Sequence, residues 1–546
     1  MNLKQNRLFV KSNYINFLFY FLPFVSFYFS LYQLNQQYDG HHHGIVFSIS
    51  EDFLNGKIPY RDFFPHYGIS YIIINSLFIK IFNGTIYGTY FFISLTKGIT
   101  FLNFASIIKK LFDKKIAISA MLMMFFLHPF VGTPWPDYLF FMFILISFYI
   151  LIISNNNFFL FVSGFFYSIA SLTKDNFTII LFFTIVIFFI YLFFLRYVRK
   201  KKIQNFFLNI YWIAGYIAPL TIFFLYLIYN SILFEYLDHF QISKFAIQYF
   251  CSSEINIYSL RIFDCGIIAL KELFINSISQ ILTEPYWLFF LLIIILNIFF
   301  IINIFFFNEK KIISKNELII LWISFLSLIL FSNNFYGLAV QRLFTGVSLG
   351  LIVLIYLIQN FKSPINRYFL YCVLIAFLIN GIQFSRTPNN PIYPTYAKKI
   401  YNPSNNLKFL KFKKLSKDEW FQLTEFKSLT NNIANKCTFI NYSTNLTNDV
   451  FFRIILKQKF KLLNFIPIGP RNRFTAQMFE KYDNNFYSNL RLQINKNNIL
   501  IAVDQTSEIN LELKNNLNLY LVKSIKYSGY GTRFINIYLS RNCKVI

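Results

Sequence analysis

Long apolar runs recur along this chain and restrict it to one kind of fold. A helix needs about 20 consecutive apolar residues to cross the hydrocarbon core of a bilayer. Runs close to that length begin near Tyr14 and recur as far as Phe384. Of the 546 residues, 56% are hydrophobic and only 14% are charged, a more apolar balance than soluble domains have. The sequence therefore predicts a mainly α-helical protein, a polytopic membrane bundle.

Lysine and arginine clusters orient the predicted spans, because cytoplasmic loops carry an excess of both residues. Lys4, Arg7 and Lys11 place the N-terminus in the cytoplasm, and the clusters at 109–115 and 196–202 must share that side. This pattern accounts for the net charge of +27 without a nucleic-acid partner, and surplus cations also suit anionic membrane lipids. The first run is too long and too aromatic for a removable signal peptide, so we expect it to span the membrane.

The number of membrane crossings between two cytoplasmic clusters must be even, and this rule decides how the stretch after the first span is placed. Residues 69–81 and 86–108 are both apolar, but if both crossed, the lysines at 109–110 would lie outside. Because 69–81 is about half of a normal span, we expect a helix at the membrane surface or a re-entrant helix. The count becomes about eleven spans, with the N-terminus inside and the C-terminus outside. The predicted spans are residues 14–32, 86–108, 116–127, 138–153, 158–172, 177–195, 210–229, 285–307, 318–331, 344–358 and 368–384.

The predicted organisation has two units. Residues 1–384 form the transmembrane unit, and its external loop, 33–85, carries two surface helices. The turn-rich phrase Thr387-Pro-Asn-Asn-Pro-Ile-Tyr-Pro394 marks a linker, 385–399. Beyond it, residues 400–546 alternate strand-like and helix-like stretches, which predicts a small external α/β domain. The strand-like runs are 437–441, 463–468, 499–503, 520–525 and 534–539, and the helix-like ones are 418–431 and 475–482.

Four of the five cysteines fall in segments predicted to be external, where disulfides form. We expect the pairs Cys251–Cys265 and Cys437–Cys543, because each pair stays within one segment. Four unrelated thiols are the alternative.

Polar residues gather in the loops predicted to be external. Together they supply carboxylates that could deprotonate a hydroxyl group and cations that could stabilise a phosphate leaving group. The residues are Asp39, His41, His42, His43, Glu51, Asp52, Arg61, Asp62, His66, His128, Asp137, Lys174, Asp175 and Arg342. The sequence contains no Walker motif, no dinucleotide fingerprint and no Cys-x-x-Cys pair.

The order of these polar residues along the chain, and the short phrases around them, resemble the GT-C superfamily of polytopic glycosyltransferases. That superfamily includes protein O-mannosyltransferases and the aminoarabinose transferases that modify lipid A. In that family an acid follows the first span, as Asp39 does here, and two surface helices follow, as at 44–55 and 68–81. Bacterial members often carry a phrase similar to Gly56-Lys-Ile-Pro-Tyr-Arg-Asp-Phe63. Many members have paired acids at the first position, whereas Asp39 is followed by Gly40 and three histidines.

Two later positions extend the resemblance. An acid in the second external loop corresponds to Asp137, and a Thr-Lys phrase after a short span corresponds to Thr173-Lys174. The resemblance implies a sugar donor linked to a polyprenyl phosphate and an inverting displacement at the periplasmic face of the bacterial inner membrane. The acceptor would be a glycan, a lipid or a protein.

The resemblance also assigns roles to residues. Asp39 would be the catalytic base, with Asp137 second. Arg61, Lys174 and Arg342 would contact the lipid phosphate, and Asp62 and His66 would shape the sugar or acceptor pocket. His43 would bind the substrate, and whether it also assists Asp39 is left open. No cofactor is required by this chemistry, but a divalent metal stays an open alternative, with His41 and His43 as weak candidate ligands.

Each residue also has a simpler interpretation. Asp39 could be a solvated loop acid, and Arg61 with Asp62 a structural ion pair. Asp137 could cap the following helix, as aspartate often does at an N-cap. Lys174 could pair with Asp175, and Arg342 could be an interfacial residue that snorkels to water.

Two other function classes stay open on the sequence alone. A transporter or flippase for lipid-linked saccharides would place ionisable residues near the bilayer midplane and often shows inverted repeats. Here the acids gather at one face and the predicted spans are almost free of charge, which favours an enzyme. An O-antigen polymerase or ligase typically has its large external loop late in the chain, whereas the richest loop here follows the first span.

Overall fold

The structure of this chain is a computed structural model. It describes residues 2–36, 42–63, 65, 67–112, 118, 120–122, 124, 135–154, 156–203, 209–238, 262–279, 286–307, 312–334, 340–360, 405–411, 413–433, 437–441, 454–456, 460–464, 492, 499–504, 519–526, 534–540 and 543.

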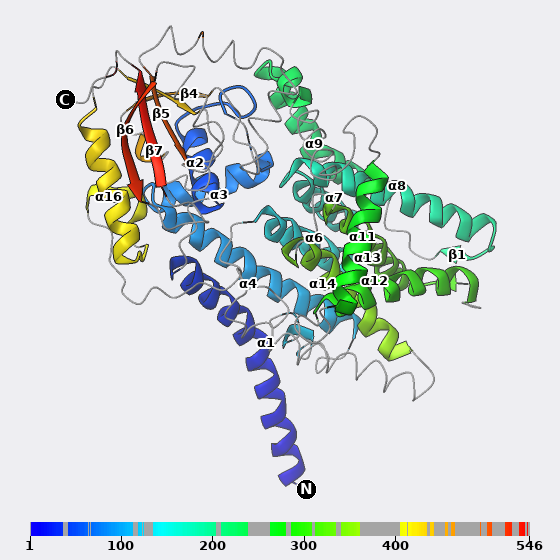
Figure 1. Ribbon diagram of the computed structural model, residues 1–546. Helices are drawn as coiled ribbons and strands as arrows, with labels where there is room; N and C mark the ends of the chain where they lie inside the picture. The colour runs from blue at the N-terminus through cyan, green and yellow to red at the C-terminus, as the bar shows by residue number, and fades with distance from the viewer. Residues whose placement is uncertain are drawn as a thin grey trace.

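The described part of the chain is a helical bundle with a β-sheet beside one end (Figure 1). Eight of the described helices are long and apolar enough to cross a membrane. They are α1 (Asn2–Gln36), α4 (Ile86–Leu111), α6 (Pro136–Ile153), α8 (Asp175–Tyr197), α9 (Ile210–Tyr229), α12 (Tyr286–Ile302), α13 (Lys315–Ile329) and α14 (Val340–Asn360). The predicted polytopic helical fold is therefore confirmed.

The number of crossings stays a prediction. The helix α7 (Asn157–Ser171) is apolar, but its 15 residues are fewer than in any of the eight spans, since α13 counts as a span of 19 residues, Lys315–Asn333, with the turn that follows it. Most of the predicted span at 116–127, and all of that at 368–384, lies outside the described residues.

The first loop carries two helices, α2 (His42–Leu54) and α3 (Ile69–Ile81), close to the predicted positions. With 13 residues, α3 is about 20 Å long, too short for a hydrocarbon core of about 30 Å. The two helices pack together through polar contacts. The Nδ2 of Asn75 donates to the Oγ of Ser50 over 2.8 Å, and the Oγ of Ser76 donates to the carbonyl of Ser50 over 3.0 Å.

Helix ends that the charge pattern assigns to the cytoplasm meet at one end of the bundle. The Nζ of Lys201, after α8, donates to the carbonyl of Ile304 beyond the end of α12. The Nζ of Lys315, at the start of α13, donates to the carbonyl of Ser154 after α6. Short strands β1 (Lys202–Ile203) and β2 (Ile312–Ile313) pair in parallel beside them. Cations at helix C-termini satisfy the last carbonyls and complement the helix dipole, which accounts for these two lysine contacts.

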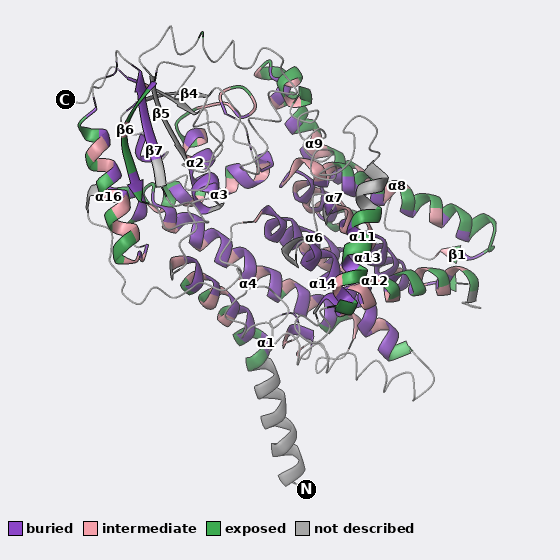
Figure 2. Cartoon of the chain, viewed as in Figure 1, coloured by how far each residue is buried: buried purple, intermediate pink, exposed green. Residues whose placement is uncertain are grey.

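The bundle buries its inner helices and exposes apolar side chains on its outer ones. Figure 2 shows α6, α13 and α14 mostly buried, whereas α8 and α9 have broad exposed faces. The exposed residues of α8 and α9 include phenylalanine and isoleucine, which suit contact with lipid tails. Aromatic rings fill the interior: Trp322 stacks on Phe188 and meets Trp212 edge to face.

The C-terminal part contains a five-stranded mixed sheet. Its strands are β3 (Thr438–Asn441), β4 (Lys461–Asn464), β5 (Ile499–Asp504), β6 (Leu519–Lys526) and β7 (Phe534–Ser540). The order is β4-β3-β5-β7-β6, with β3 parallel to both β4 and β5 and with β7 antiparallel to β5 and β6. All five strands lie near the predicted runs. The predicted domain boundaries stay a prediction, and the predicted helix at 475–482 lies outside the described residues.

A helix and a disulfide bond complete this sheet. The helix α16 (Lys417–Asn431) begins at a capping box in which Ser416 and Glu419 satisfy each other's backbone N–H groups. A disulfide joins Cys437, before β3, to Cys543, after β7, as predicted. The predicted Cys251–Cys265 pair is not described: Cys251 lies outside the described residues, and Cys265 lies in α11 (Ile262–Ser279) with its side chain undescribed.

The disulfide provides a test of what holds the sheet together. Replacing both Cys437 and Cys543 with serine should lower the free energy of unfolding of the sheet by roughly 2–4 kcal/mol, because the bond closes a long loop. Thermal unfolding in detergent, with hydrogen exchange at β3 and β7, measures the change. Cys372→Ser is the control. Equal unfolding of the double variant and the control would contradict the expectation.

Candidate functional site

The loop after α2 is closed by its own aspartate. The Oδ2 of Asp62 accepts from the backbone N–H of Ile58 over 2.8 Å, and the backbone N–H of Asp62 donates to the carbonyl of Ile58 over 2.9 Å. Between them Tyr60 takes a positive φ of 70°, which an L-residue adopts only when its surroundings hold it there. The phrase 56–63 therefore folds as a tight, self-bonded turn.

Arg61 and Asp62 form an ion pair at the surface of this turn. The Nε of Arg61 lies 3.0 Å from Oδ1 of Asp62, and its Nη2 lies 3.2 Å from Oδ2. The hydrogen bonds from Arg61 hold the pKa of the Asp62 carboxyl below its usual range, helped by the backbone N–H of Ile58. In this structure Asp62 braces the loop, and Arg61 is half-exposed beside it.

The same loop docks on the turn between α7 and α8. The backbone N–H of Gly68 donates to the carbonyl of Thr173 over 2.9 Å, and that of Ser70 donates to Leu172 over 3.1 Å. A Cβ on Gly68 would collide with the carbonyl oxygen of Leu172, so only glycine permits this approach. The docked loop thereby lies directly beside the start of α8.

A tyrosine of the loop reaches the same turn. The Oη of Tyr60 donates to Oδ1 of Asp175 over 3.2 Å. Burial, with the Asp175 charge second, raises the pKa of Tyr60, which keeps its hydroxyl a donor. This hydrogen bond ties the loop to Asp175, the first residue of α8.

A buried polar cluster lies where three helix ends meet. Asp137 is in the first turn of α6, Lys174 precedes α8, and Asn333 lies in the 3₁₀ turn η2 (Leu330–Asn334) after α13. The Nδ2 of Asn333 donates to Oδ1 of Asp137 over 2.6 Å. The Oδ1 of Asn333 accepts from the Nζ of Lys174 over 3.2 Å and from the Nδ2 of Asn176 over 3.1 Å. The side-chain amide of Asn333 therefore bridges the carboxylate of Asp137 and the ammonium group of Lys174.

The acid in this cluster is only partly satisfied. Asp137 is 2% exposed, and among the described residues its Oδ2 accepts no hydrogen bond. The Nζ of Lys174 lies 4.0 Å from that oxygen, too far for a hydrogen bond but close enough for strong attraction in a buried site. The N-cap of α6 is Trp135, not Asp137, so the capping interpretation of Asp137 is wrong. A buried carboxylate with a free oxygen beside a cation can accept a proton or hold a polar substrate.

His43 and Lys97 contact tyrosines elsewhere in the bundle. The Nδ1 of His43, at the start of α2, lies 3.0 Å from the Oη of Tyr90 on α4. Lys97 follows Tyr90 by seven residues and so lies on the same face of α4. It is buried, and its Nζ lies 4.7 Å from the ring centre of Tyr138. Lys97 is an ionisable residue inside a span, an exception to the expectation that the spans are almost free of such residues.

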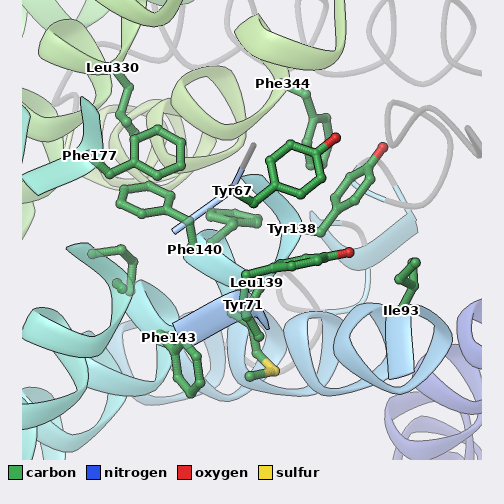
Figure 3. Close-up of a cluster of buried hydrophobic side chains, with 14 of the residues drawn as sticks. Tyr67, Tyr71, Ile93, Tyr138, Leu139, Phe140, Phe143, Phe177, Leu330 and Phe344 are labelled. Atoms are coloured by element: carbon green, nitrogen blue, oxygen red, sulfur yellow. The ribbon is translucent and has the colours of Figure 1, made fainter. Parts of the chain in front are cut away.

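The ring that Lys97 meets belongs to a group of tyrosines. Figure 3 shows Tyr138 with Tyr67 and Tyr71 inside the bundle. Tyr67 and Tyr71 meet edge to face, with their ring centres 5.2 Å apart. Hydroxyl-bearing rings therefore lie between the first loop and the start of α6.

The structure brings together two pairs of predicted site residues. Asp137 meets Lys174 in the buried cluster, and Arg61 meets Asp62 at the surface of the loop. His43 instead contacts a tyrosine on α4. The second candidate for the base, Asp137, and one candidate for the phosphate contact, Lys174, thus lie in one cluster, and their roles stay a prediction.

Several of the other predicted site residues have side chains that are not described. Arg342 lies in the first turn of α14, and its side chain is outside the description. Four more lie outside the described residues altogether: Asp39, His41, His66 and His128. Within the part of the chain that the structure describes, no group of three histidine, cysteine, aspartate or glutamate side chains could hold a metal ion.

Sequence reasoning missed Asn333, Asn176 and Lys97. Asparagine is common throughout this chain, so nothing in the Ser332-Asn333-Asn334 phrase separates it from an ordinary turn. Lys97 could have been found from the sequence, because it is a lysine within an apolar run and ionisable residues within spans are usually functional.

The fold and this cluster define a class of protein: a polytopic membrane bundle with an acid and a cation at its predicted external end. No protein-family model matches the chain, and no curated protein matches it. A solved structure of ArnT from Cupriavidus metallidurans, bound to undecaprenyl phosphate, matches with a TM-score of 0.55 and 9% identity, over 95% of this chain and 97% of that chain.

Two structures of the Archaeoglobus fulgidus oligosaccharyltransferase also match, each with a TM-score of 0.45. One, tethered with an acceptor peptide, has 11% identity over 91% of this chain and 70% of that chain. The other, in complex with Zn and sulfate, has 12% identity over 90% and 68%. The match to ArnT, at almost full length of both chains, confirms the GT-C resemblance at the level of the fold.

The docking of the first loop can be tested at Gly68. Gly68→Ala should expose the loop, because its methyl group would collide with the backbone of Leu172. We expect a loss of roughly 1–3 kcal/mol in stability and faster tryptic cleavage after Lys57 and Arg61. Gly98→Ala is the control, since its Cβ would meet the Cβ of Phe27 at 3.2 Å and the carbonyl oxygen of Pro23 at 3.3 Å, contacts that ask for a shift of only a few tenths of an ångström. Unchanged cleavage in Gly68→Ala would show that the loop does not depend on this contact.

The bridging role of Asn333 gives a second prediction. Asn333→Leu removes the amide that bonds Asp137, so the buried carboxylate loses its donor and the free energy of unfolding should fall by about 1.5–3 kcal/mol. Thermal unfolding in detergent measures it. Asn360→Leu is a matched control, because this exposed amide bonds to its own helix, at Tyr356. A similar melting temperature for both variants would rule out the bridge as a stabilising contact.

Proposed function

We propose that this protein is a membrane glycosyltransferase that takes a sugar from a polyprenyl-phosphate donor and transfers it to an acceptor at the periplasmic face of the bacterial inner membrane. The observation that carries the proposal is the buried Asp137–Asn333–Lys174 cluster at the predicted external end of the bundle. An acid with a free oxygen and a cation in one buried place are what such a displacement needs. Fold alone would not decide the function, because one fold hosts many activities.

Two further observations support the choice of donor. The protein with the matching fold, ArnT from Cupriavidus metallidurans, was solved with undecaprenyl phosphate bound. In addition, the outer helices α8 and α9 present apolar faces to the surroundings, so a lipid carrier could approach the site from the bilayer. A sugar carried on a lipid also suits an external site, where nucleotide sugars are scarce.

The proposed reaction is a single inverting displacement. The hydroxyl oxygen of the acceptor attacks the anomeric carbon of the sugar, and the bond from that carbon to the phosphate oxygen breaks. The hydroxyl proton passes to a carboxylate, and the polyprenyl phosphate leaves with the bonding electron pair. No covalent intermediate with the protein forms.

The roles follow from charge and position. Asp39 belongs to the segment between α1 and α2, and we assign it as the base, with Asp137 second. Lys174 would stabilise the phosphate that leaves, because its Nζ already lies in the buried cluster. Arg61 and Arg342 are further candidates for the phosphate.

The remaining predicted residues would shape the site. Asp62 would act through the loop that it closes, and His66 would line the sugar or acceptor pocket. His43 would assist Asp39 from the start of α2. The acceptor is a glycan, a lipid or a protein, and the proposed chemistry needs no metal ion.

Substitution of the acids and of the lysine tests the proposal. Asp39→Asn should abolish transfer from a panel of undecaprenyl-phosphate hexoses and pentoses, because an amide cannot accept the hydroxyl proton. Asp137→Asn and Lys174→Met should lower kcat by about 100-fold or more, the usual range for a general base or an electrostatic contact. Membrane insertion should not change. Asp418→Asn, an exposed acid on α16, is the control.

Two results would count against this function. Full activity in Asp39→Asn would remove that residue as the base. Movement of the lipid-linked sugar across the membrane of reconstituted vesicles, without transfer to any acceptor, would instead indicate a transporter or flippase.

A further inference from the structure

A lysine from the C-terminal part of the chain is buried against the first part of the bundle. Lys413 is 0% exposed and follows the short turn η3 (Asn405–Leu410). Its Nζ donates to the carbonyl of Leu34, in the last turn of α1, over 3.2 Å. The same Nζ lies 4.8 Å from the ring centre of Tyr90 on α4. Residues 379 positions apart in the sequence therefore meet at the end of α1.

The contact supplies what α1 lacks. The last turn of a helix leaves carbonyl groups without partners and carries a partial negative charge, which a cation stabilises. The last turn of α1 contains no basic residue of its own. Lys413 provides that cation, and the neighbouring Lys414 donates its backbone N–H to Asn35.

The other contact of Lys413 leads to the start of α2. The Oη of Tyr90 lies 3.0 Å from Nδ1 of His43. One ammonium group thus touches the end of α1 directly and the start of α2 through Tyr90. The segment between these two helices is residues 37–41, and it contains Asp39.

We propose that Lys413 is a positioning residue that fixes both ends of the Asp39 segment, so that the C-terminal part of the chain helps to form the active site. A buried ammonium group is costly unless its contacts compensate, and packing alone would be served by an apolar residue. The inference deepens the proposed function and rests on it where it concerns catalysis.

Three full-length variants test the inference. Lys413→Met removes the charge and keeps an apolar side chain of similar length, and Lys413→Arg keeps the charge. Lys408→Met is the control, because Lys408 is exposed in the same segment. Hydrogen exchange in residues 34–43 should become about 10-fold faster in Lys413→Met than in Lys408→Met. Exchange in β3 and β7 should not change.

Kinetics with the undecaprenyl-phosphate sugar panel add a second measurement. Lys413→Met should lower kcat about 10-fold and leave KM for the donor within twofold, whereas Lys413→Arg should restore most of the rate. A large rise in KM would overturn the proposal, because it would mean that Lys413 contacts the donor itself. Unchanged kcat, or unchanged exchange in residues 34–43, would also overturn it. If the wild type transfers no sugar, the proposed function fails, and hydrogen exchange alone decides the role of Lys413.

Discussion

The approach of Gly68 to the turn at Leu172–Lys174 is the contact on which the arrangement of the site depends. Two backbone hydrogen bonds join the first loop to that turn, and no side chain fits between them. The turn also leads into α8 and carries Lys174, which reaches the Asp137 cluster. A loop that begins after α2 is thereby held beside residues from α6, α8 and the end of α13.

The Asp137 cluster solves a problem of charge burial. A carboxylate taken out of water needs donors, yet a close ion pair with Lys174 would commit both groups to each other. The amide of Asn333 separates them: its Nδ2 bonds the acid and its Oδ1 accepts from the lysine. Acid and cation stay near each other without a hydrogen bond between them, and within the described part of the chain one oxygen of Asp137 accepts no hydrogen bond.

The sequence predicted most of the fold and named two residues of the candidate cluster. Apolar length marked the spans, short strand-like runs marked the five strands, and the resemblance to GT-C enzymes singled out Asp137 and Lys174. Partners set by tertiary contact could not be predicted, because Asn333 and Lys413 resemble many other polar residues in this chain. Lys413 meets Leu34 across 379 positions, and no periodicity carries information over that distance.

Lys97 bears on the choice between an enzyme and a transporter. A transporter places ionisable groups near the bilayer midplane, and Lys97 lies about 16 Å along α4 from its first residue, Ile86. Its observed contact is with Tyr138, however, which is the residue next to Asp137 in the first turn of α6. Lys97 therefore lies against the first turn of α6, the turn that also carries Asp137. Asp137, Lys174 and Asn333 all stand at helix ends, and that placement suits a reaction at one end of the bundle better than passage through the membrane.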